Sequence, residues 1–403
     1  MRTVVSIAPT FLAPKGLLPV SRPDVIVIGG GIAGAATALY LARDGVRVTL
    51  VEGAVIGGGA SGANAGSLHA QIPHDPFRNL GAAWAGAFQP VVTLLARSLG
   101  MWRELEADLG CDLEIAFGGG VMVGATPAEC DEIAAKAEIE RAAGLDITLL
   151  GRNALRDAAP YLAETALGGA FCAIEGKANP MRVAPAYAAA ARAAGVTIVA
   201  GQGPAAIART GQGYAVTTGE RVIDADRLVI AAGGATGGLA AQLGADLAIT
   251  STPIQVCVTE PAEPFVPHLV YCAGEKLSLK QSRVGSILIG GGWDARLDDR
   301  GRPVVDAANL SANLRVAMRI VPGIAGLNLV RSWAALVNGT DDWLPIIGEL
   351  PQAPGAFINY VPWLGFSGGP AAARITADLV LGKPPSLDVP LASFAPKATL
   401  NAG

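Results

Sequence analysis

Residues 25–34 read VIVIGGGIAG and predict a buried strand, a tight glycine turn and the first turn of a helix. Gly29, Gly31 and Gly34 have the spacing G-x-G-x-x-G, and a second predicted strand ends on Glu52, close to the ~20 residues expected after the last glycine. The first glycine permits the turn, the second lets a pyrophosphate approach the backbone, and the third lets helix and strand pack closely. The helix N-terminus offers free N–H groups to phosphate. The pattern therefore predicts a βαβ unit that binds a dinucleotide, with a glycine-rich turn without ligand as the alternative.

At 403 residues the chain is longer than one ordinary hydrophobic core, which predicts two domains. The formal net charge is −4 and no lysine or arginine run stands out, so nucleic acid is not an expected partner. The five cysteines are scattered and form no C-x-x-C pair, which predicts a reducing compartment, no structural zinc and no iron–sulfur cluster within this chain. They are Cys111, Cys130, Cys172, Cys257 and Cys272.

The uncharged run over residues 25–42 is long enough to be scored as a membrane span. Its glycines and the switch from strand to helix favour a buried βα unit instead, so we expect no integral membrane segment. Residues 1–21 carry three prolines and lack the layout of a signal peptide, which predicts a flexible arm, with docking onto a partner chain as one reading. We expect a cytoplasmic protein, or one peripheral to the inner membrane.

Three predicted strands run into glycines. The first begins at residue 25, the second is LVIAAGG over residues 228–234, and the third precedes GFSGGP at residues 365–370. A strand-rich block over residues 252–327 interrupts this pattern. Residues 90–109 predict a helix, and residues 112–123 a pair of strands. The fold class expected is α/β, with a discontinuous Rossmann-like nucleotide-binding domain and an inserted α+β substrate domain on a mostly antiparallel sheet. The ranges are 22–85, 180–250 and 328–385 for the first domain, 86–179 and 251–327 for the second, and 386–403 for a C-terminal tail.

These residues together resemble the D-amino-acid oxidase-like family of flavoenzymes, which includes glycine oxidase, sarcosine oxidase and D-amino-acid dehydrogenase. The resemblance spans about residues 23–385 and rests on residues 25–52, on ASGANAGSLHAQ, on DRLVIAAGGAT, and on NGTDDWLPIIG followed by GFSGGP. Within the family, SGANAGSLHAQ and LKQSRVGSILIGGG are most similar to flavin subunits of opine oxidases, D-hydroxyproline dehydrogenases and hydrogen cyanide synthases.

The resemblance implies FAD, bound non-covalently because no cysteine lies next to the segments expected at the flavin ring. The glycines would face the pyrophosphate and Glu52 the adenosine ribose, while the helix starting at Gly365 would stabilise the negative charge of a reduced flavin. The residues implied to contact the cofactor are Gly29, Gly31, Ile32, Ala33, Gly34, Glu52, Gly53, Ala60, Ser61, Asn64, Ala65, Gly66, Ser67, Leu68, Pro204, Ala232, Gly233, Leu364, Gly365, Phe366 and Ser367.

The chemistry implied is oxidation of a C–N bond by hydride transfer to the flavin, in an amino acid, an imino acid or an opine-like secondary amine. Because the cofactor carries the hard step, we expect no catalytic triad and no metal site. His69 is expected at the ring face, either in contact with the substrate or in structural packing.

Two positions depart from the family pattern. Glycine-oxidase-like relatives hold the substrate carboxylate with arginines, yet Val337 and Trp363 stand where these are expected. Either the substrate is anchored elsewhere, or it is not a simple amino acid, or another subunit completes the site. Lys280 is the main candidate for a cation that replaces these arginines; the alternative is that it is an ordinary lysine on an edge strand. Arg283 and Arg331 are further candidates. Trp363 would alternatively pack on an N-substituted substrate.

The leading hypothesis is a subunit of a larger dehydrogenase, whose iron–sulfur centre or second flavin would sit on partner chains because this chain lacks the cysteines. The missing arginines motivate an alternative, an FAD-binding scaffold or electron-transfer subunit without turnover of its own. A nicotinamide enzyme is disfavoured by the long glycine-rich segment over residues 53–67 and by the late GFSGGP junction.

Overall fold

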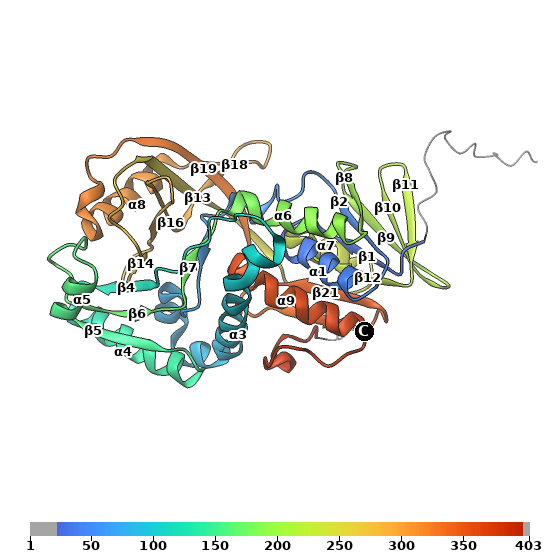
Figure 1. Cartoon of the computed structure of the whole chain (residues 1–403), viewed down its shortest axis with the longest axis horizontal. Helices are drawn as coiled ribbons and strands as arrows, with labels where there is room; N and C mark the ends of the chain where they lie inside the picture. The colour runs from blue at the N-terminus through green and yellow to red at the C-terminus, as the bar shows by residue number, and fades with distance from the viewer. Residues whose placement is uncertain (1–21, 398–403) are drawn as a thin grey trace, which may run out of the picture.

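The computed structural model describes residues 22–397 and contains two large sheets at opposite ends of its long axis, with the longest helix between them (Figure 1). The first sheet has the order β20-β21-β12-β1-β2-β8 and is parallel except for the edge strand β20. Its strands are β1 (Val25–Ile28), β2 (Val48–Glu52), β8 (Thr197–Ala200), β12 (Arg227–Ile230), β20 (Ile346–Glu349) and β21 (Ala356–Tyr360). The central strand β1 is entirely apolar and buried, as expected for a strand of a sheet that is covered on both faces.

Alternate residues of β1 belong to different hydrophobic clusters. Val25 and Val27 face the helices, which are α1 (Ile32–Arg43), α6 (Pro180–Ala193) and α9 (Gly365–Val380). Ile26 and Ile28 face a three-stranded sheet and a short helix, which are β9 (Ala205–Thr210), β10 (Gly213–Thr218), β11 (Arg221–Ala225) and α7 (Thr236–Ala241). This alternation follows from the two-residue period of a strand.

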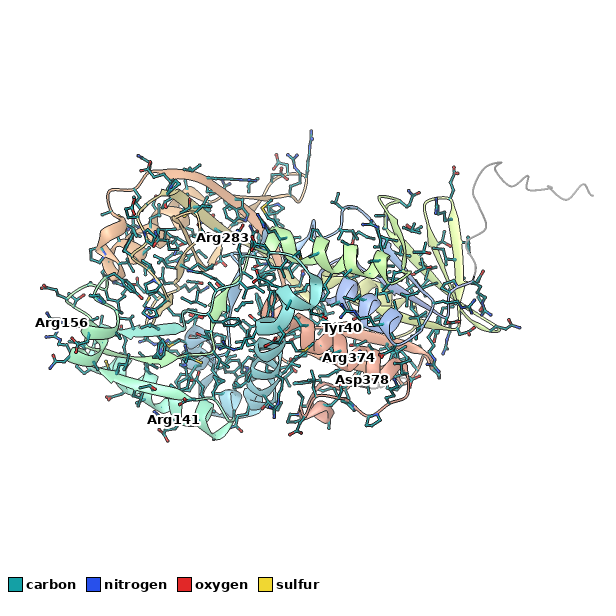
Figure 2. The ribbon with its side chains drawn as sticks, viewed as in Figure 1. Tyr40, Arg141, Arg156, Arg283, Arg374 and Asp378 are labelled. Carbon is teal, nitrogen blue, oxygen red and sulfur yellow. The ribbon has the colours of Figure 1, made fainter. Side chains whose placement is uncertain are left out.

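An ion-pair cluster joins α1 to α9 at the surface (Figure 2). The Arg374 guanidinium donates to Asp44 at 2.6 Å and to Asp378 at 2.7 Å, and it lies 5.3 Å from the ring centre of Tyr40. The contact links α9 to the C-terminal end of α1, and the N-terminus of α9 points toward the second sheet (Figure 1).

The second sheet has the order β19-β13-β16-β15-β14-β4-β6-β5, and all its pairs are antiparallel except β14 with β4. Its strands are β4 (Gly120–Gly124), β5 (Ile147–Gly151), β6 (Gly168–Cys172), β13 (Thr250–Pro261), β14 (Leu269–Cys272), β15 (Ser278–Gln281), β16 (Ser286–Asp294) and β19 (Leu329–Gly339). The predicted fold class, a Rossmann-like domain with a mostly antiparallel substrate domain, is confirmed. The domain boundaries stay a prediction; β19, within the range assigned to the first domain, pairs with β13 along its length.

The helix predicted over residues 90–109 is longer, since α3 runs over His74–Leu109 with a kink at Gly81, where φ is 81°. The prediction of two strands over residues 112–123 is wrong except for β4. The backbone before β4 forms other hydrogen bonds, since the Leu113 N–H donates to the Glu106 carboxylate. The remaining elements are α2 (Ala60–Ala63), β3 (Ser67–Leu68), α4 (Pro127–Ala142), α5 (Arg152–Ala158), β7 (Gly176–Lys177), β17 (Arg296–Leu297), β18 (Pro303–Val304), α8 (Ala307–Ile320) and three 3-10 turns. Within residues 22–397, no helix has both the length and the apolar character needed to span a membrane.

A fully buried ion pair on α4 fixes the segment after β3. The Lys136 ammonium donates to Glu140 at 2.5 Å, both side chains are 0% exposed, and Glu140 also accepts from the backbone N–H of Ile72 at 2.7 Å. Buried charges are tolerated only when each is paired and hydrogen-bonded.

Replacing Lys136 with methionine should lower the free energy of unfolding by about 3–5 kcal/mol, because it leaves the Glu140 charge buried and unpaired. Chemical denaturation measures the change. The double variant Lys136→Met/Glu140→Gln should recover a large part of this loss, since the amide is uncharged and still accepts from Ile72. A double variant no more stable than Lys136→Met would contradict this account of the pair.

Candidate active site

The glycine turn after β1 has the conformation that the sequence predicts. Gly29 has a φ of 113°, and a Cβ added to Gly34 would lie 1.9 Å from the Gly29 carbonyl oxygen. A Cβ on Gly29 would itself lie 2.3 Å from the Ala231 carbonyl oxygen, so the ends of β1 and β12 are in contact here. Gly31, the N-cap of α1, has no side chain to cap the helix, which leaves backbone N–H groups of the first turn for a phosphate, apart from that of Ile32, which donates to Ser61.

Glu52 ends β2 beside this turn. Its carboxylate accepts from the backbone N–H of Gly30 at 2.7 Å and of Ala54 at 2.8 Å. The next residue, Gly53, accepts at its carbonyl from the N–H of Gly203 at 2.9 Å, which brings Pro204 alongside. The residues predicted at the adenosine end therefore come together from β2 and from the loop after β8.

The small-residue segment after Glu52 returns to the N-terminus of α1. The Ser61 hydroxyl accepts from the backbone N–H of Ile32 at 3.0 Å, and the Asn64 amide closes the following turn by donating to Ser61 and accepting from Gly66. The chain then enters β3, which lies against the start of α9.

Ser367 joins the two segments predicted at the flavin ring. Its hydroxyl accepts from the backbone N–H of His69 at 2.8 Å and donates to the Ser67 carbonyl at 3.3 Å. Its own carbonyl accepts from Ser98 and Trp102 of α3. The N-terminus of α9 carries no side-chain cap, so its free N–H groups open onto this junction.

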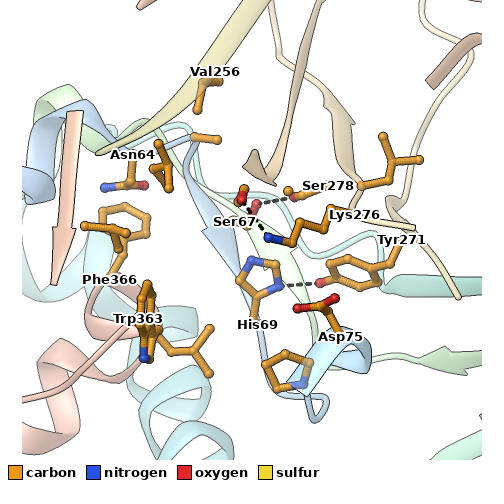
Figure 3. Close-up of a pocket in the computed structure, with 18 of the residues that line it drawn as sticks. Asn64, Ser67, His69, Asp75, Val256, Tyr271, Lys276, Ser278, Trp363 and Phe366 are labelled. Atoms are coloured by element: carbon orange, nitrogen blue, oxygen red, sulfur yellow. Dashed lines mark hydrogen bonds between the residues drawn. The ribbon is translucent and has the colours of Figure 1, made fainter. Parts of the chain in front are cut away.

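A cavity of about 400 Å³ lies between this junction and the second sheet (Figure 3). Its walls are mostly apolar and aromatic, and both Val337 and Trp363 line it. Trp363 has a φ of 54°, an uncommon value for a bulky residue, and its ring stacks on Trp343 with centroids 4.8 Å apart. Trp363 therefore forms a fixed wall at the position where the family pattern places an arginine.

The charges around the cavity differ from those expected. Among the described residues, Lys276 is the one lysine or arginine that lines it, together with the carboxylates Asp75, Glu275 and Asp294. Lys280 is not a lining residue: it is 2% exposed and donates to the Ser67 hydroxyl at 2.6 Å. Burial, with a smaller contribution from the charge of Lys177, lowers the pKa of Lys280 to about 7.

The two arginines considered as replacement cations have other contacts. Arg283 forms ion pairs with Asp112 and Glu114, and Arg331 lies 5.8 Å from the ring centre of Trp333. Neither lines the cavity.

His69 lines the cavity and begins a chain of hydrogen bonds that leads into the protein interior. Its Nδ1 lies 2.6 Å from the Tyr271 hydroxyl, which donates to the Glu175 carboxylate at 3.1 Å. Burial, aided by the charge of Lys280, lowers the pKa of His69 to about 3, so the imidazole is neutral. In residues 22–397, no group of three or more histidine, cysteine or acidic side chains is arranged to hold a metal ion.

Residues 24–379 match the family described as FAD dependent oxidoreductase. The chain belongs to this family. It is 27% identical over 378 residues to the glycine oxidase of Geobacillus kaustophilus, covering 91% of this chain and 95% of the relative. It is 26% identical over 344 residues to a subunit of the opine oxidase of Rhizobium meliloti, covering 83% and 87%. The solved glycine oxidase from Geobacillus kaustophilus superposes with a TM-score of 0.76 at 26% identity, covering 94% of this chain and 99% of that one.

Membership confirms two predictions: the chain is an FAD-dependent oxidoreductase, and its cofactor is FAD. The described residues fit such a cofactor, because neither α1 nor α9 has a capping side chain at its N-cap residue, and Glu52 lies beside the start of α1, where it accepts from the Gly30 N–H. The glycine turn leaves no room for Cβ atoms at Gly29 or Gly34. The contact of each predicted residue with FAD stays a proposal.

Four residues around the cavity were not found by sequence reasoning: Glu175, Tyr271, Lys276 and Trp343. Each lies in an ordinary sequence context, and none is close in sequence to the residues it joins. Cys272 also lines the cavity, where burial raises the pKa of its thiol to about 12 and keeps it protonated.

Replacing Glu52 with glutamine should weaken FAD binding at least about tenfold, or about 1.4 kcal/mol. The amide has one acceptor oxygen where the carboxylate uses two, so it cannot hold both backbone N–H groups and also accept from a ribose. Titration of FAD into the apoprotein, followed by flavin fluorescence, measures the affinity. Glu220→Gln, an exposed change between β10 and β11, is the matched control; equal affinity of Glu52→Gln and wild type would contradict the assignment.

Proposed function

We propose that this chain oxidises the C–N bond of a small amine: an amino acid, an imino acid or an opine-like secondary amine. The observation that carries the proposal is the aromatic-walled cavity where His69, β3 and the N-terminus of α9 meet. FAD, when bound, supplies the hydride acceptor. The names of the relatives, a glycine oxidase and an opine oxidase among them, support this substrate class.

The residues proposed to hold FAD have distinct roles. The turn from Gly29 to Gly34 would hold the pyrophosphate, with Ser61 beside it, and Glu52 the adenosine ribose. Gly66 to Leu68 would run beside the flavin. The N-terminus of α9 would stabilise negative charge on it, as a helix N-terminus does for anions.

The substrate would lie among His69, Trp363 and Lys276. Trp363 offers a flat apolar face suited to a substituent on the amine, and Lys276 is the lining cation able to attract a carboxylate. His69, neutral at working pH, would face the nitrogen. This arrangement replaces the pair of arginines expected from the family.

We further propose that the chain works in an assembly, since several of its relatives are named as subunits of sarcosine oxidases or of opine oxidases. Electrons would leave to an iron–sulfur centre or a second flavin on a partner chain, in the cytoplasm or at the inner membrane. The second candidate, a scaffold subunit without turnover, is favoured by one observation, the absence of arginine among the cavity-lining residues described.

Anaerobic mixing separates the two candidates. The FAD-loaded chain is mixed with amino acids, imino acids and opine-like amines while the visible absorbance of the flavin is recorded. Catalysis predicts that at least one compound bleaches the flavin. Bleaching by dithionite but by none of these compounds would overturn the proposal in favour of the scaffold.

Replacing Lys276 with methionine should raise KM for a carboxylate-bearing substrate by tenfold or more, because a hydrogen bond to a charged group contributes about 1.5–3 kcal/mol. A matched amine without the carboxylate should be unaffected. Initial rates with an artificial electron acceptor measure both, with the exposed Lys383→Met as control. Equal effects on the two substrates would show that Lys276 does not bind the carboxylate.

A further inference from the structure

The chain from His69 to Glu175 runs from the cavity wall into the protein interior, because the His69–Tyr271 bond is partly buried and the Tyr271–Glu175 bond is buried. Glu175 is 0% exposed, and its carboxylate accepts from Ala70 N–H at 2.6 Å, from Gln71 N–H at 2.9 Å, from the Gln71 side-chain amide at 2.9 Å and from the Tyr271 hydroxyl at 3.1 Å. Beyond Tyr271 comes His69 Nδ1, at 2.6 Å (Figure 3).

The hydrogen-bond roles along this chain follow from its chemistry. Three of the four donors to Glu175 are N–H groups, which cannot accept, so Tyr271 is the one partner able both to give and to take a proton. When Glu175 is ionised, Tyr271 must donate to it. The Tyr271 oxygen then accepts from His69 Nδ1–H, and Nε2 of His69 is left with a free lone pair.

That lone pair is available to a ligand. The His69 ring lines the cavity, and none of the hydrogen bonds found among residues 22–397 involves its Nε2. A buried carboxylate thus sets the tautomer of a histidine at the cavity wall, through one tyrosine.

We propose that His69, Tyr271 and Glu175 form a proton relay that takes one proton from the substrate nitrogen and stores it on Glu175. The proposal rests on the function proposed above, oxidation of an amine in this cavity. The nitrogen–proton bond of the substrate ammonium breaks as a bond forms at His69 Nε2. The Nδ1 proton passes to the Tyr271 oxygen, and the hydroxyl proton of Tyr271 passes to Glu175. No electrons are transferred; the substrate becomes a neutral amine, whose lone pair assists hydride loss from the adjacent carbon.

A relay explains how a histidine of such low basicity can take a proton from the substrate nitrogen. His69 begins and ends as a neutral imidazole, so no imidazolium forms beside Lys280. The proton ends on a carboxyl group whose pKa is raised by burial, against the opposing effect of its N–H donors. Burial and the Glu175 charge also raise the pKa of Tyr271, so Tyr271 passes the proton without becoming a stable phenolate.

The neighbouring charged and titratable groups are compatible with the transfer of a proton to Glu175. Lys136 reaches the Gln71 amide oxygen at 3.4 Å, and its charge is balanced by Glu140. Cys172 of β6 faces Glu175 and is neutral, because burial raises the pKa of its thiol. Lys280 of β15 faces His69. Asp75 lies in the cavity wall.

Tyr271→Phe tests the relay, because it removes one hydroxyl and keeps the ring. The rate of anaerobic flavin reduction is measured against pH with an amine that reduces the wild type. Without the relay only substrate already neutral in solution reacts. The variant should therefore be tenfold or more slower below the pKa of the substrate amine, with a rate rising about tenfold per pH unit toward wild type. A variant profile parallel to that of wild type would overturn the proposal.

Tyr161→Phe is the matched control, since Tyr161 bonds His268 Nδ1 at 2.7 Å and that pair does not line the cavity. This variant should keep the wild-type profile. A changed profile in Tyr161→Phe equal to that of Tyr271→Phe would show a general structural effect and overturn the assignment.

Nitrogen-15 NMR of the three histidines in the FAD-loaded protein gives a readout that needs no turnover. His69 should show a protonated Nδ1 and an unprotonated Nε2 in wild type, and this preference should be lost in Tyr271→Phe. A protonated Nε2 in the resting wild type would overturn the relay. If no amine bleaches the wild-type flavin, the proposed function fails, and the tautomer of His69 still decides whether the relay exists.

Discussion

The buried carboxylate of Glu175 holds together the parts on which the site depends. It accepts from two backbone N–H groups of the segment after β3 and from a hydroxyl of β14, so it joins that segment to the second sheet. An ionised group without solvent is tolerated only when its lone pairs are used, and here four donors use them. The position of His69 relative to the cavity follows from these bonds.

Two further contacts complete the junction. Ser367 fastens the start of α9 to β3, and the Lys136–Glu140 pair holds the N–H of Ile72. The segment from Ser67 to Ile72 is therefore fixed on both sides, by the N-terminus of α9 and by α4. A rigid segment at this place allows one histidine to present a defined nitrogen to a ligand.

Local features could be predicted from the sequence because their causes are local. The glycine turn, Glu52 at the end of β2 and the glycine-started α9 each have a recognisable pattern in a short stretch of sequence, and with the family resemblance they led to the correct fold class and cofactor. The cavity wall could not be predicted in the same way. His69 meets Tyr271, and Trp343 meets Trp363, only after two sheets have come together. Lys280 was expected to face the site because it lies on a strand of the second sheet, yet the structure directs its ammonium to Ser67, and Lys276 lines the cavity instead.

The central claim is that an amine binds in this cavity with its nitrogen at His69, beside the flavin. A crystal structure of the FAD-loaded protein with a bound, unreactive amine tests it most directly. The account predicts the amine nitrogen within about 3 Å of His69 Nε2, with Tyr271 still bridging Nδ1 and Glu175. A ligand nitrogen held elsewhere, with His69 Nε2 covered by the cofactor or by protein, would contradict it.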